Sequence, residues 1–438
     1  LGNSTEMAFC FLGAIAKGRI PSPLSNMLTT QEITKLSAQV QAKLVISDRY
    51  EDHNVIATDR INPNECDHSP HAQYADTFED SPAFLVFTSG STGIPKAVVH
   101  AHRTILGRKP MYDHWYGIGK KDRILHAGGL NWTYTLGAGF LDPIAAGTTG
   151  IIDLGSRSPE RLVQIMGSLK ATIFAAVPGV YRKILALNDQ TITTATASLR
   201  HGITAGEALH PDLYHRWVSI TNKDLYEALG QSELSTFISS GPTTPTKPGS
   251  PGKPQMGRSC CILPFDSNCT TPLHEGEQGL LAVHASDPGL MLHYVNDQEG
   301  TDAMFRGEWF IGGDVGYFDQ DGYFWHMGRH DDIMNALGYR VSPEDVERVL
   351  ITHPSILEVA AREVRVRDDL TLIAAFYTGH ECSQEDLANF LMPQLAAYKI
   401  PKMFIHLNEL PRTANGKLKR KSLPAHINEI QSLSPTTS

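Results

Sequence analysis

The sequence predicts an α/β protein in two parts. A large N-terminal domain with several sheets rich in parallel strands and a small late β region is followed by a smaller, mobile α+β domain. The 438 residues, 41% of them hydrophobic, suffice for one large and one small domain. Short apolar runs alternate with helical patterns through the first half, which is typical of parallel sheets covered by helices. From about residue 330 the pattern changes to a helix, a strand, a helix and a basic end.

The elements follow in order. Helices are predicted at 6–16 and 29–44, the second because a threonine cap precedes an acidic first turn. Short apolar runs predict strands at 42–47, 84–88, 123–126, 149–153, 171–177, 201–204 and 223–227. Antiparallel strands are expected at 279–284 and 317–326. Ser342 as N-cap and Pro343 at the first helical position open the next helix, followed by a strand at 370–377 and a helix at 383–396.

Composition excludes several classes of protein. A net charge of −9 argues against a general nucleic-acid binder, which would carry a basic face. No apolar stretch reaches the length of about 18 residues that a membrane helix requires, so no membrane span is expected. The six cysteines show no zinc-binding spacing and fit reduced thiols, which favours a cytoplasmic location.

The stretch LVFTSGSTGIPKAVVHAHR (85–103) predicts a phosphate site. A strand, a loop of Gly, Ser and Thr, and then a helix would surround phosphate oxygens with backbone N–H groups and hydroxyls. The Walker A pattern does not fit, because Gly-Lys is absent at the required offset. Taken alone, the loop could also be a plain polar turn.

Six segments together resemble the adenylate-forming enzymes, which include acyl-CoA synthetases, carrier-loading adenylation domains and luciferases. They are FTSGSTGIPKAVVHAHR (87–103), TAGEAL (204–209), YEALGQSE (226–233), GSPGKP (249–254), the long stretch 310–347 and LPRTANGKLKR (410–420). Their order and spacing hold across nearly the whole chain. The resemblance implies a large AMP-binding domain at 1–328, a hinge at 329–331, a small domain at 332–429 and a tail at 430–438. It also implies that a further N-terminal segment of the family is missing before residue 1.

The resemblance implies a reaction in two halves, with ATP, Mg²⁺ and coenzyme A as cofactors. A carboxylate attacks ATP to form an acyl-adenylate and pyrophosphate, and a thiol then displaces AMP. The phosphate loop would hold the ATP phosphates through Thr88, Ser89, Gly90, Ser91, Thr92, Gly93 and Lys96. Ser232 would bond the α-phosphate, and Glu233 would act in catalysis and hold the metal ion. The adenosine would be contacted by Gly206, Glu207, Ala208, Glu227, Asp314 and Arg329, with Asp314 on the ribose.

The resemblance implies roles for four further residues in the two half-reactions and in the change between them. The small domain would rotate about Asp331. Lys417 would supply a positive charge during adenylation, whereas Gly338 and Arg340 would face CoA in the other state.

The acid itself is expected to be a monocarboxylate larger than acetate: medium-chain, branched or aromatic. The expected pocket includes Trp132 and Gly230, the latter at a position where acetyl-CoA synthetases carry a bulky Trp. Trp132 and Tyr134 fit ordinary core aromatics equally well.

The preferred function is therefore a carboxylate–CoA ligase acting on a small molecule. Two alternatives stay open: a stand-alone adenylation enzyme that loads a carrier protein, and an inactive, truncated remnant. A homodimer also stays open.

Overall fold

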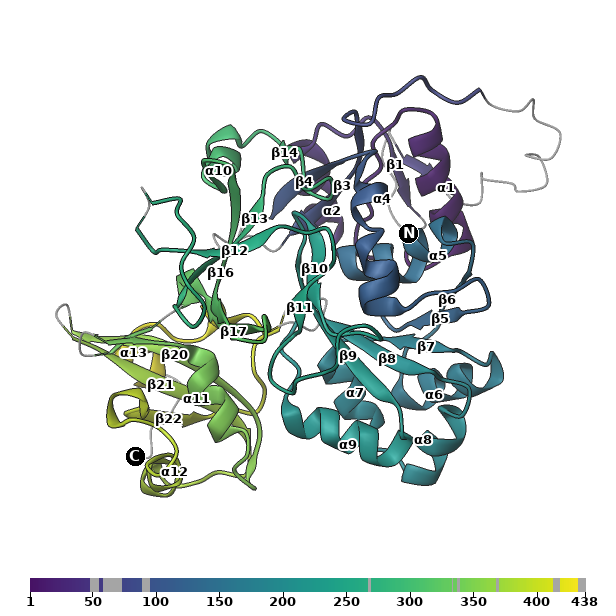
Figure 1. The fold of residues 1–438 in the computed structure, drawn as a ribbon. Helices are drawn as coiled ribbons and strands as arrows, with labels where there is room; N and C mark the ends of the chain where they lie inside the picture. Colours follow the sequence, from purple (N-terminus) through teal and green to yellow (C-terminus); the bar gives the residue numbers. More distant parts are fainter. Residues whose placement is uncertain are drawn as a thin grey trace. The chain divides into compact units, whose positions relative to one another are not determined.

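The computed structural model describes residues 1–47, 55–57, 73–88, 95–266, 269–332, 334–336, 339–367, 370–412 and 418–431 (Figure 1). The chain forms two compact units. The first contains residues 1–260, 282–312 and 321–324, and the second contains residues 261–281, 313–320 and 325–438. The domain boundaries expected from the sequence stay a prediction.

Unit 1 begins with helices and short strands and continues as an α/β alternation. Its first elements are α1 (Thr5–Ala16), α2 (Thr30–Gln39), β1 (Val45–Ser47), β2 (Val55–Ala57), β3 (Pro82–Thr88), β4 (Lys96–Ala101), α4 (Thr104–Gly107) and a π-helix at Tyr112–Tyr116. There follow β5 (Arg123–His126), a π-helix at Thr135–Leu141, α5 (Asp142–Ala145), β6 (Thr149–Ile152), α6 (Pro159–Ser168), β7 (Ile173–Ala175), α7 (Pro178–Ile184), α8 (Asp189–Ala195), β8 (His201–Ala205), α9 (Pro211–Thr221), β9 (Asp224–Gln231), β10 (Ser235–Ser239) and β11 (Lys253–Pro254).

The main sheet of unit 1 has seven strands in the order β11-β10-β9-β8-β7-β5-β6. Strands β5 to β9 pair in parallel, whereas β10 pairs antiparallel with both β9 and β11. The α/β fold class with a parallel-rich sheet is therefore confirmed. The carboxyl ends of β8 and β9 lie side by side, at the edge where open α/β sheets bind their ligands.

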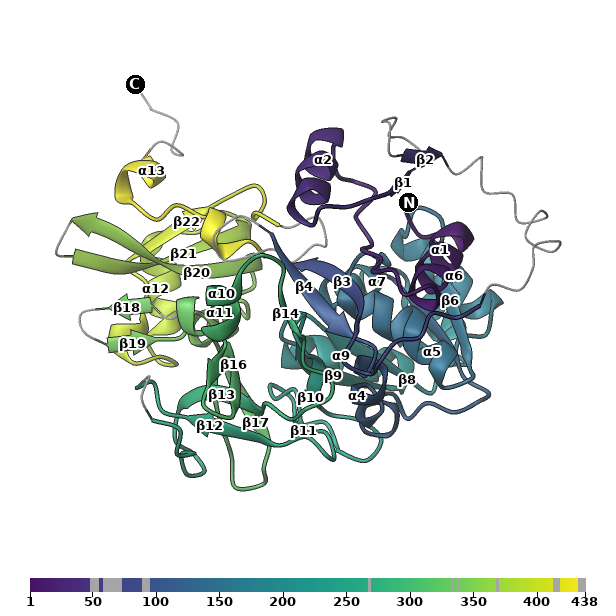
Figure 2. The same cartoon turned by 90° about the horizontal axis from the view of Figure 1, so that it is seen from above.

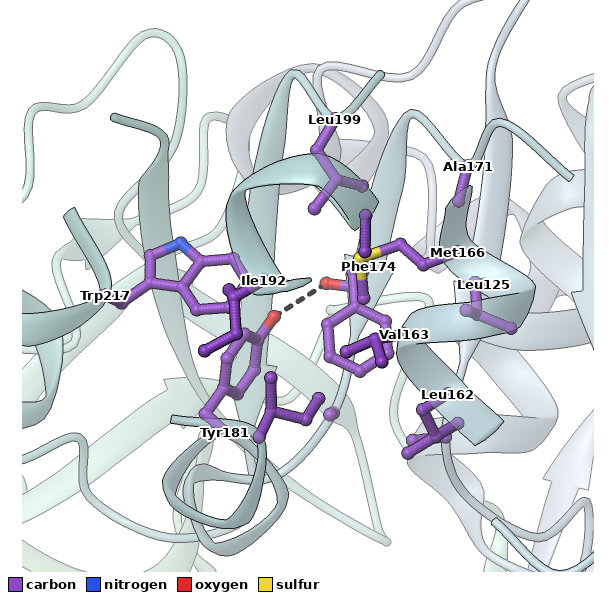
Figure 3. Packing of buried hydrophobic residues seen from close by; sticks show 14 of the residues in the cluster. Leu125, Leu162, Val163, Met166, Ala171, Phe174, Tyr181, Ile192, Leu199 and Trp217 are labelled. Carbon is purple, nitrogen blue, oxygen red and sulfur yellow. Dashed lines mark hydrogen bonds between the residues drawn. The ribbon is translucent and has the colours of Figure 1, made fainter. Parts of the chain in front are cut away.

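Alternating residues of these strands supply two cores. Leu125, Phe174 and Leu225 pack on one face against α6 to α9, and the Tyr181 hydroxyl donates to the Phe174 carbonyl at 2.8 Å (Figure 3). Their neighbours Ile124 and Ile173 face the opposite side, where Trp115 and Tyr116 of the first π-helix and Tyr134 pack. Because successive strand residues point to opposite faces, the sheet is covered on both sides.

A second, three-stranded sheet has the order β14-β4-β3. Its third strand β14 (His293–Tyr294) is far away in the sequence and pairs antiparallel with β4 through Val99 and Val98. After β14 the chain continues through α10 (Gln298–Asp302) and β15 (Phe305–Arg306). Strands β3 and β4 of this sheet fix the positions of the two ends of the predicted phosphate loop.

Unit 2 contains a three-stranded sheet with strands β20, β21 and β22 side by side (Figure 2). Its elements are β17 (Phe324–Arg329), a 3₁₀ turn at His330–Asp332, β18 (Met334–Ala336), β19 (Tyr339–Val341), α11 (Pro343–Leu350), β20 (Ile356–Arg367), β21 (Leu370–Gly379), α12 (Gln384–Leu391), 3₁₀ turns at Ala397–Lys399 and Arg420–Ser422, β22 (Met403–His406) and α13 (Ile427–Gln431). A further sheet contains β12 (Cys260–Leu263), β13 (Gly279–His284), β16 (Trp309–Phe318) and β15, and β17 pairs with β16.

Several local predictions are confirmed. The strands at 123–126 and 279–284 have the predicted bounds. The α11 start is also confirmed, since the Ser342 hydroxyl accepts from the Glu344 N–H at 3.1 Å. Among the described residues, no helix is both long and apolar enough to cross a membrane.

Three local predictions are wrong. No helix follows the phosphate loop directly, because 96–101 is a strand paired with β3. The single strand expected at 317–326 is two strands, β16 and β17, separated by a turn in which Gly322 has φ +77°. The long strand β20 was not expected at all.

Candidate active site

The predicted phosphate loop connects two antiparallel strands. Thr88 ends β3 and Lys96 begins β4, and the two residues pair directly. Residues 89–94 lie outside the described part of the chain, and with them Ser89, Gly90, Ser91, Thr92 and Gly93. On both sides of residues 89–94 the described chain is thus a strand, and the predicted phosphate role of the loop stays a prediction.

Lys96 is held at the end of this loop by two neighbours. Its Nζ lies 2.9 Å from Asp297 Oδ2 and 4.4 Å from the centre of the Tyr294 ring. The hydrogen bond from Lys96 and that from the Gly300 N–H lower the pKa of Asp297. The ammonium group is therefore fixed in position and stays partly accessible, with 31% of the side chain exposed.

Ser232 and Glu233 lie on the turn between β9 and β10. The Ser232 hydroxyl is 3.2 Å from the Thr133 hydroxyl. Glu233 is held at both ends, because its carbonyl accepts from the Met291 N–H at 2.7 Å and its Oε1 accepts from the Tyr294 hydroxyl at 2.7 Å. Ser232, predicted to bond the α-phosphate, and Glu233, the predicted metal ligand, thus lie on one turn that these hydrogen bonds hold in place.

A buried histidine also supports this turn. His100 on β4 places Nε2 2.8 Å from the Ser232 carbonyl, so Nε2 carries the proton and donates. Burial lowers the pKa of His100 to about 4, so the imidazole is neutral at pH 7.

The predicted adenine turn follows β8. Gly206 has φ +94°, a conformation that L side chains rarely adopt. A Cβ at this position would also lie 2.9 Å from the Trp132 ring, which packs against the turn. Next to it, the buried Glu227 of β9 accepts the Leu209 N–H at 2.9 Å. Glu207 and Ala208 lie on this turn, so the predicted adenine residues are brought together.

Trp132 and Gly230, the two predicted pocket residues, have different surroundings in the structure. Trp132 is partly buried and meets Tyr134 edge to face at 5.4 Å. Tyr134 is a core residue whose hydroxyl donates to the Ile203 carbonyl at 3.2 Å. At Gly230, however, a Cβ would lie 2.6 Å from the Ser235 carbonyl oxygen and 2.7 Å from Thr236 Cα. Strand pairing therefore accounts for a glycine at this position, and its place in the pocket for the acid stays a prediction.

In unit 2, the predicted ribose residue Asp314 lies on β16 with 4% of its surface exposed. His326 Nε2 is 3.1 Å from its Oδ1, and Arg329 NH1 is 3.6 Å from the same oxygen. The preceding residue is Gly313, where the family usually has Thr, and its φ is +84°. A Cβ there would come within 3.1 Å of the Arg329 guanidinium, so the glycine lets Arg329 approach.

His326 bridges two carboxylates, since its Nδ1 lies 2.9 Å from Glu344 Oε1 on α11. Because both ring nitrogens face acceptors, the imidazole is doubly protonated. Burial alone lowers the pKa of His326, but the charges and hydrogen bonds of Glu344 and Asp314 outweigh it and raise the pKa to about 10. Its position within a strand pattern gave no hint of this role.

We expect His326→Gln to destabilise the protein more at pH 6 than at pH 10. The folded-state pKa lies above the unfolded value of about 6.5, so the stabilisation is complete below pH 6.5 and is lost as pH rises through about 10. Urea unfolding of wild type and variant at both pH values measures this difference. His284→Gln, in an exposed pair 3.5 Å from Glu308, is the control. An equal loss at both pH values would contradict the bridge.

The remaining predicted site residues, or their side chains, lie outside the described part of the chain. Lys417 and Gly338 lie outside the described residues, and the side chains of Asp331 and Arg340 do as well. The backbone of Asp331 forms part of the 3₁₀ turn at 330–332.

A metal-like cluster in unit 2 is explained without a metal. His353, Cys382 and Asp386 each bring a ligand-type atom within 4.8 Å of the others. The Ser355 N–H donates to His353 Nδ1 at 3.3 Å, so Nδ1 accepts and Nε2 is the donor of this ring. That nitrogen lies 3.4 Å from Asp386 Oδ2 and faces it as a donor rather than as a metal ligand.

Comparison with known proteins agrees with this geometry. The profile of the AMP-binding enzyme family matches residues 1–295, and that of the AMP-binding enzyme C-terminal domain matches residues 345–417. The acyl-coenzyme A synthetase ACSM3 of Homo sapiens is 32% identical over 351 residues, which span 77% of this chain and 59% of that protein. The benzoate–CoA ligase of Thauera aromatica is 29% identical over 443 residues, 94% of this chain and 82% of the ligase.

A solved structure gives the same fold. The anthranilate CoA ligase AuaEII in complex with anthranoyl-AMP has a TM-score of 0.84 and 28% identity, covering 96% of this chain and 85% of that one. Because the profile of the AMP-binding enzyme family matches residues 1–295, more than half of the sequence, the chain belongs to the AMP-binding enzyme family.

Proposed function

We propose that the protein is an ATP-dependent carboxylate–CoA ligase that works through an acyl-adenylate. The observation that carries the proposal is the joint placement of Lys96, at the end of the phosphate loop, and Glu233, on the β9–β10 turn, around Tyr294. A cation for phosphate and a carboxylate for a metal ion are what a bound magnesium triphosphate requires.

Each of the predicted site residues has a role in the proposed first half-reaction. A carboxylate oxygen of the acid attacks the α-phosphorus, the bond to the bridging oxygen breaks and pyrophosphate leaves. The Ser232 hydroxyl donates to the α-phosphate, Lys96 pairs with the outer phosphates and Asp314 accepts the ribose hydroxyls. Glu233 holds Mg²⁺, which when bound neutralises phosphate charge. Lys417 supplies the positive charge between the acid and the α-phosphate.

In the second half-reaction the CoA thiolate attacks the acyl carbon. The bond from this carbon to the phosphate oxygen breaks, a thioester forms and AMP leaves. Gly338 and Arg340 would then face CoA after rotation about Asp331. The cytoplasmic location inferred from the cysteines stays a prediction.

We infer that the acid is a monocarboxylate larger than acetate, with aromatic acids foremost. Support comes from the benzoate–CoA ligase and the anthranilate CoA ligase, which both match more than nine tenths of this chain. The partly buried ring of Trp132 would offer such an acid an aromatic surface beside the adenine turn.

The test is pyrophosphate release with ATP and Mg²⁺ from a panel of acetate, hexanoate, isobutyrate, benzoate and 2-aminobenzoate, each with and without CoA. Thioester formation from the larger acids is the expected result. Release that CoA does not convert to a thioester would favour the carrier-loading alternative. If folded protein releases no pyrophosphate with any acid, loss of ATP binding as well would favour the inactive alternative, whereas retained ATP binding would mean that the panel lacks the substrate. Glu233→Gln is the matched control and should suppress release.

A further inference from the structure

Tyr294 lies between the two groups that carry the proposed function. It is on the short strand β14, opposite Val98 of β4, and only 4% of its surface is exposed. Its N–H donates to the Thr301 hydroxyl at 3.0 Å, which fixes the strand to α10. The ring therefore has a rigid base on the same sheet that holds Lys96.

The phenol hydroxyl of Tyr294 acts on Glu233. It donates a 2.7 Å hydrogen bond to Oε1, one of two carboxylate oxygens. A hydrogen bond to an ionised acceptor is strong and directional, so it sets the rotation of the carboxylate. As a result, the second carboxylate oxygen of Glu233, Oε2, points in one defined direction.

The face of the same ring acts on Lys96, whose Nζ lies 4.4 Å above its centre. An ammonium at this distance is attracted by the negative face of the ring. Asp297, three residues further along the chain, holds the same ammonium from another side at 2.9 Å. The Tyr294 ring and the Asp297 carboxylate thus hold the Lys96 ammonium from two sides.

We propose that Tyr294 is a positioning residue that sets the Glu233 carboxylate and the Lys96 ammonium relative to each other, so that one side chain adjusts both the metal ligand and the phosphate cation. The inference rests on the proposed function, because it takes Glu233 as the metal ligand. A purely structural role would make Tyr294 a packing residue with no effect on metal affinity.

The experiment is a titration with Mn²⁺, followed by electron paramagnetic resonance, in the presence of α,β-methylene-ATP. The methylene bridge between the α- and β-phosphorus atoms of this nucleotide is not cleaved, so no acyl-adenylate forms and the measurement does not depend on activity. Tyr294→Phe keeps the ring and removes the hydroxyl, and it should weaken Mn²⁺ binding about tenfold, while nucleotide binding without metal changes less than about threefold. In a Glu233→Gln background the same substitution should have no effect on Mn²⁺ affinity.

Tyr323→Phe is the matched control. Tyr323 also donates its hydroxyl, to the Pro245 carbonyl at 2.8 Å, and its ring lies 4.7 Å from Lys253 Nζ. It should leave Mn²⁺ affinity unchanged. Equal Mn²⁺ affinity of wild type and Tyr294→Phe would overturn the proposal, whatever happens to thermal stability.

Two further outcomes are informative. Where Tyr294→Phe does not fold, Glu233→Asp breaks the same hydrogen bond by withdrawing the carboxylate by one methylene. Wild-type Mn²⁺ affinity in that variant would also overturn the proposal. Failure of the wild type to release pyrophosphate, with Mn²⁺ binding still dependent on Tyr294, would reject the ligase function and leave the role of Tyr294 intact.

Discussion

Replacing Arg108 by Met should lower the free energy of unfolding by about 3–5 kcal/mol. Arg108 and Asp142 form a bidentate pair with two 2.6 Å hydrogen bonds, and their side chains are 6% and 0% exposed. The Tyr116 hydroxyl donates to Asp142 at 2.7 Å. Removing the guanidinium leaves the carboxylate buried with no cation to balance it.

Urea unfolding followed by tryptophan fluorescence measures this loss. The control is Arg216→Met, because Arg216 and Asp189 form an exposed pair, which should be worth less than about 1 kcal/mol. A loss of the control's size for Arg108→Met would show that Asp142 is not charged in the folded protein. Arg108 also bonds the Ser235 hydroxyl, so the substitution should disturb the Glu233 turn as well.

Replacing Lys417 by Ala should lower acyl-adenylate formation about 100-fold or more, because a single cation beside a developing phosphate charge is worth several kcal/mol. Acid-dependent pyrophosphate exchange measures this half-reaction. Thioester formation from supplied acyl-adenylate should persist, since the resemblance assigns Lys417 to the first half only.

Lys421→Ala, at an exposed position four residues further on, is the control for Lys417→Ala. Exchange within threefold of wild type in the Lys417 variant would remove this lysine from the proposed mechanism.

Local sequence signals predicted the fold class and several elements well. The strand at 123–126 has the apolar pair Ile124 and Leu125 and is followed by Gly128 and Gly129, and it pairs in parallel with a strand on each side, so local composition and pairing agree. A helix was expected after the phosphate loop by analogy with strand–loop–helix phosphate sites, whereas pairing of 96–101 with Thr88 and its neighbours makes this segment a strand. The same kind of long-range pairing makes 356–367 a strand.

The site residues also divide into those that a local motif reveals and those that depend on contacts with distant parts of the chain. The turn residues Ser232 and Glu233 were found through a contiguous motif. Tyr294 and His326 act through partners at distant positions in the chain, and no spacing in the sequence expresses such contacts. The close approach of Gly230 to the β10 backbone was not predicted, because a glycine in a sequence does not reveal which neighbour its Cβ would meet.

The third strand of the β14-β4-β3 sheet has a consequence for the nascent chain. Lys96 and its partners at 294–297 are about 200 residues apart, so a ribosome adding about 5–20 residues per second needs roughly 10–40 s to complete the strand. During that interval β4 has only β3 beside it and presents its other edge for association with foreign strands. Protection of this edge by a chaperone would then matter more for the yield of protein in a cell than the stability of the finished fold.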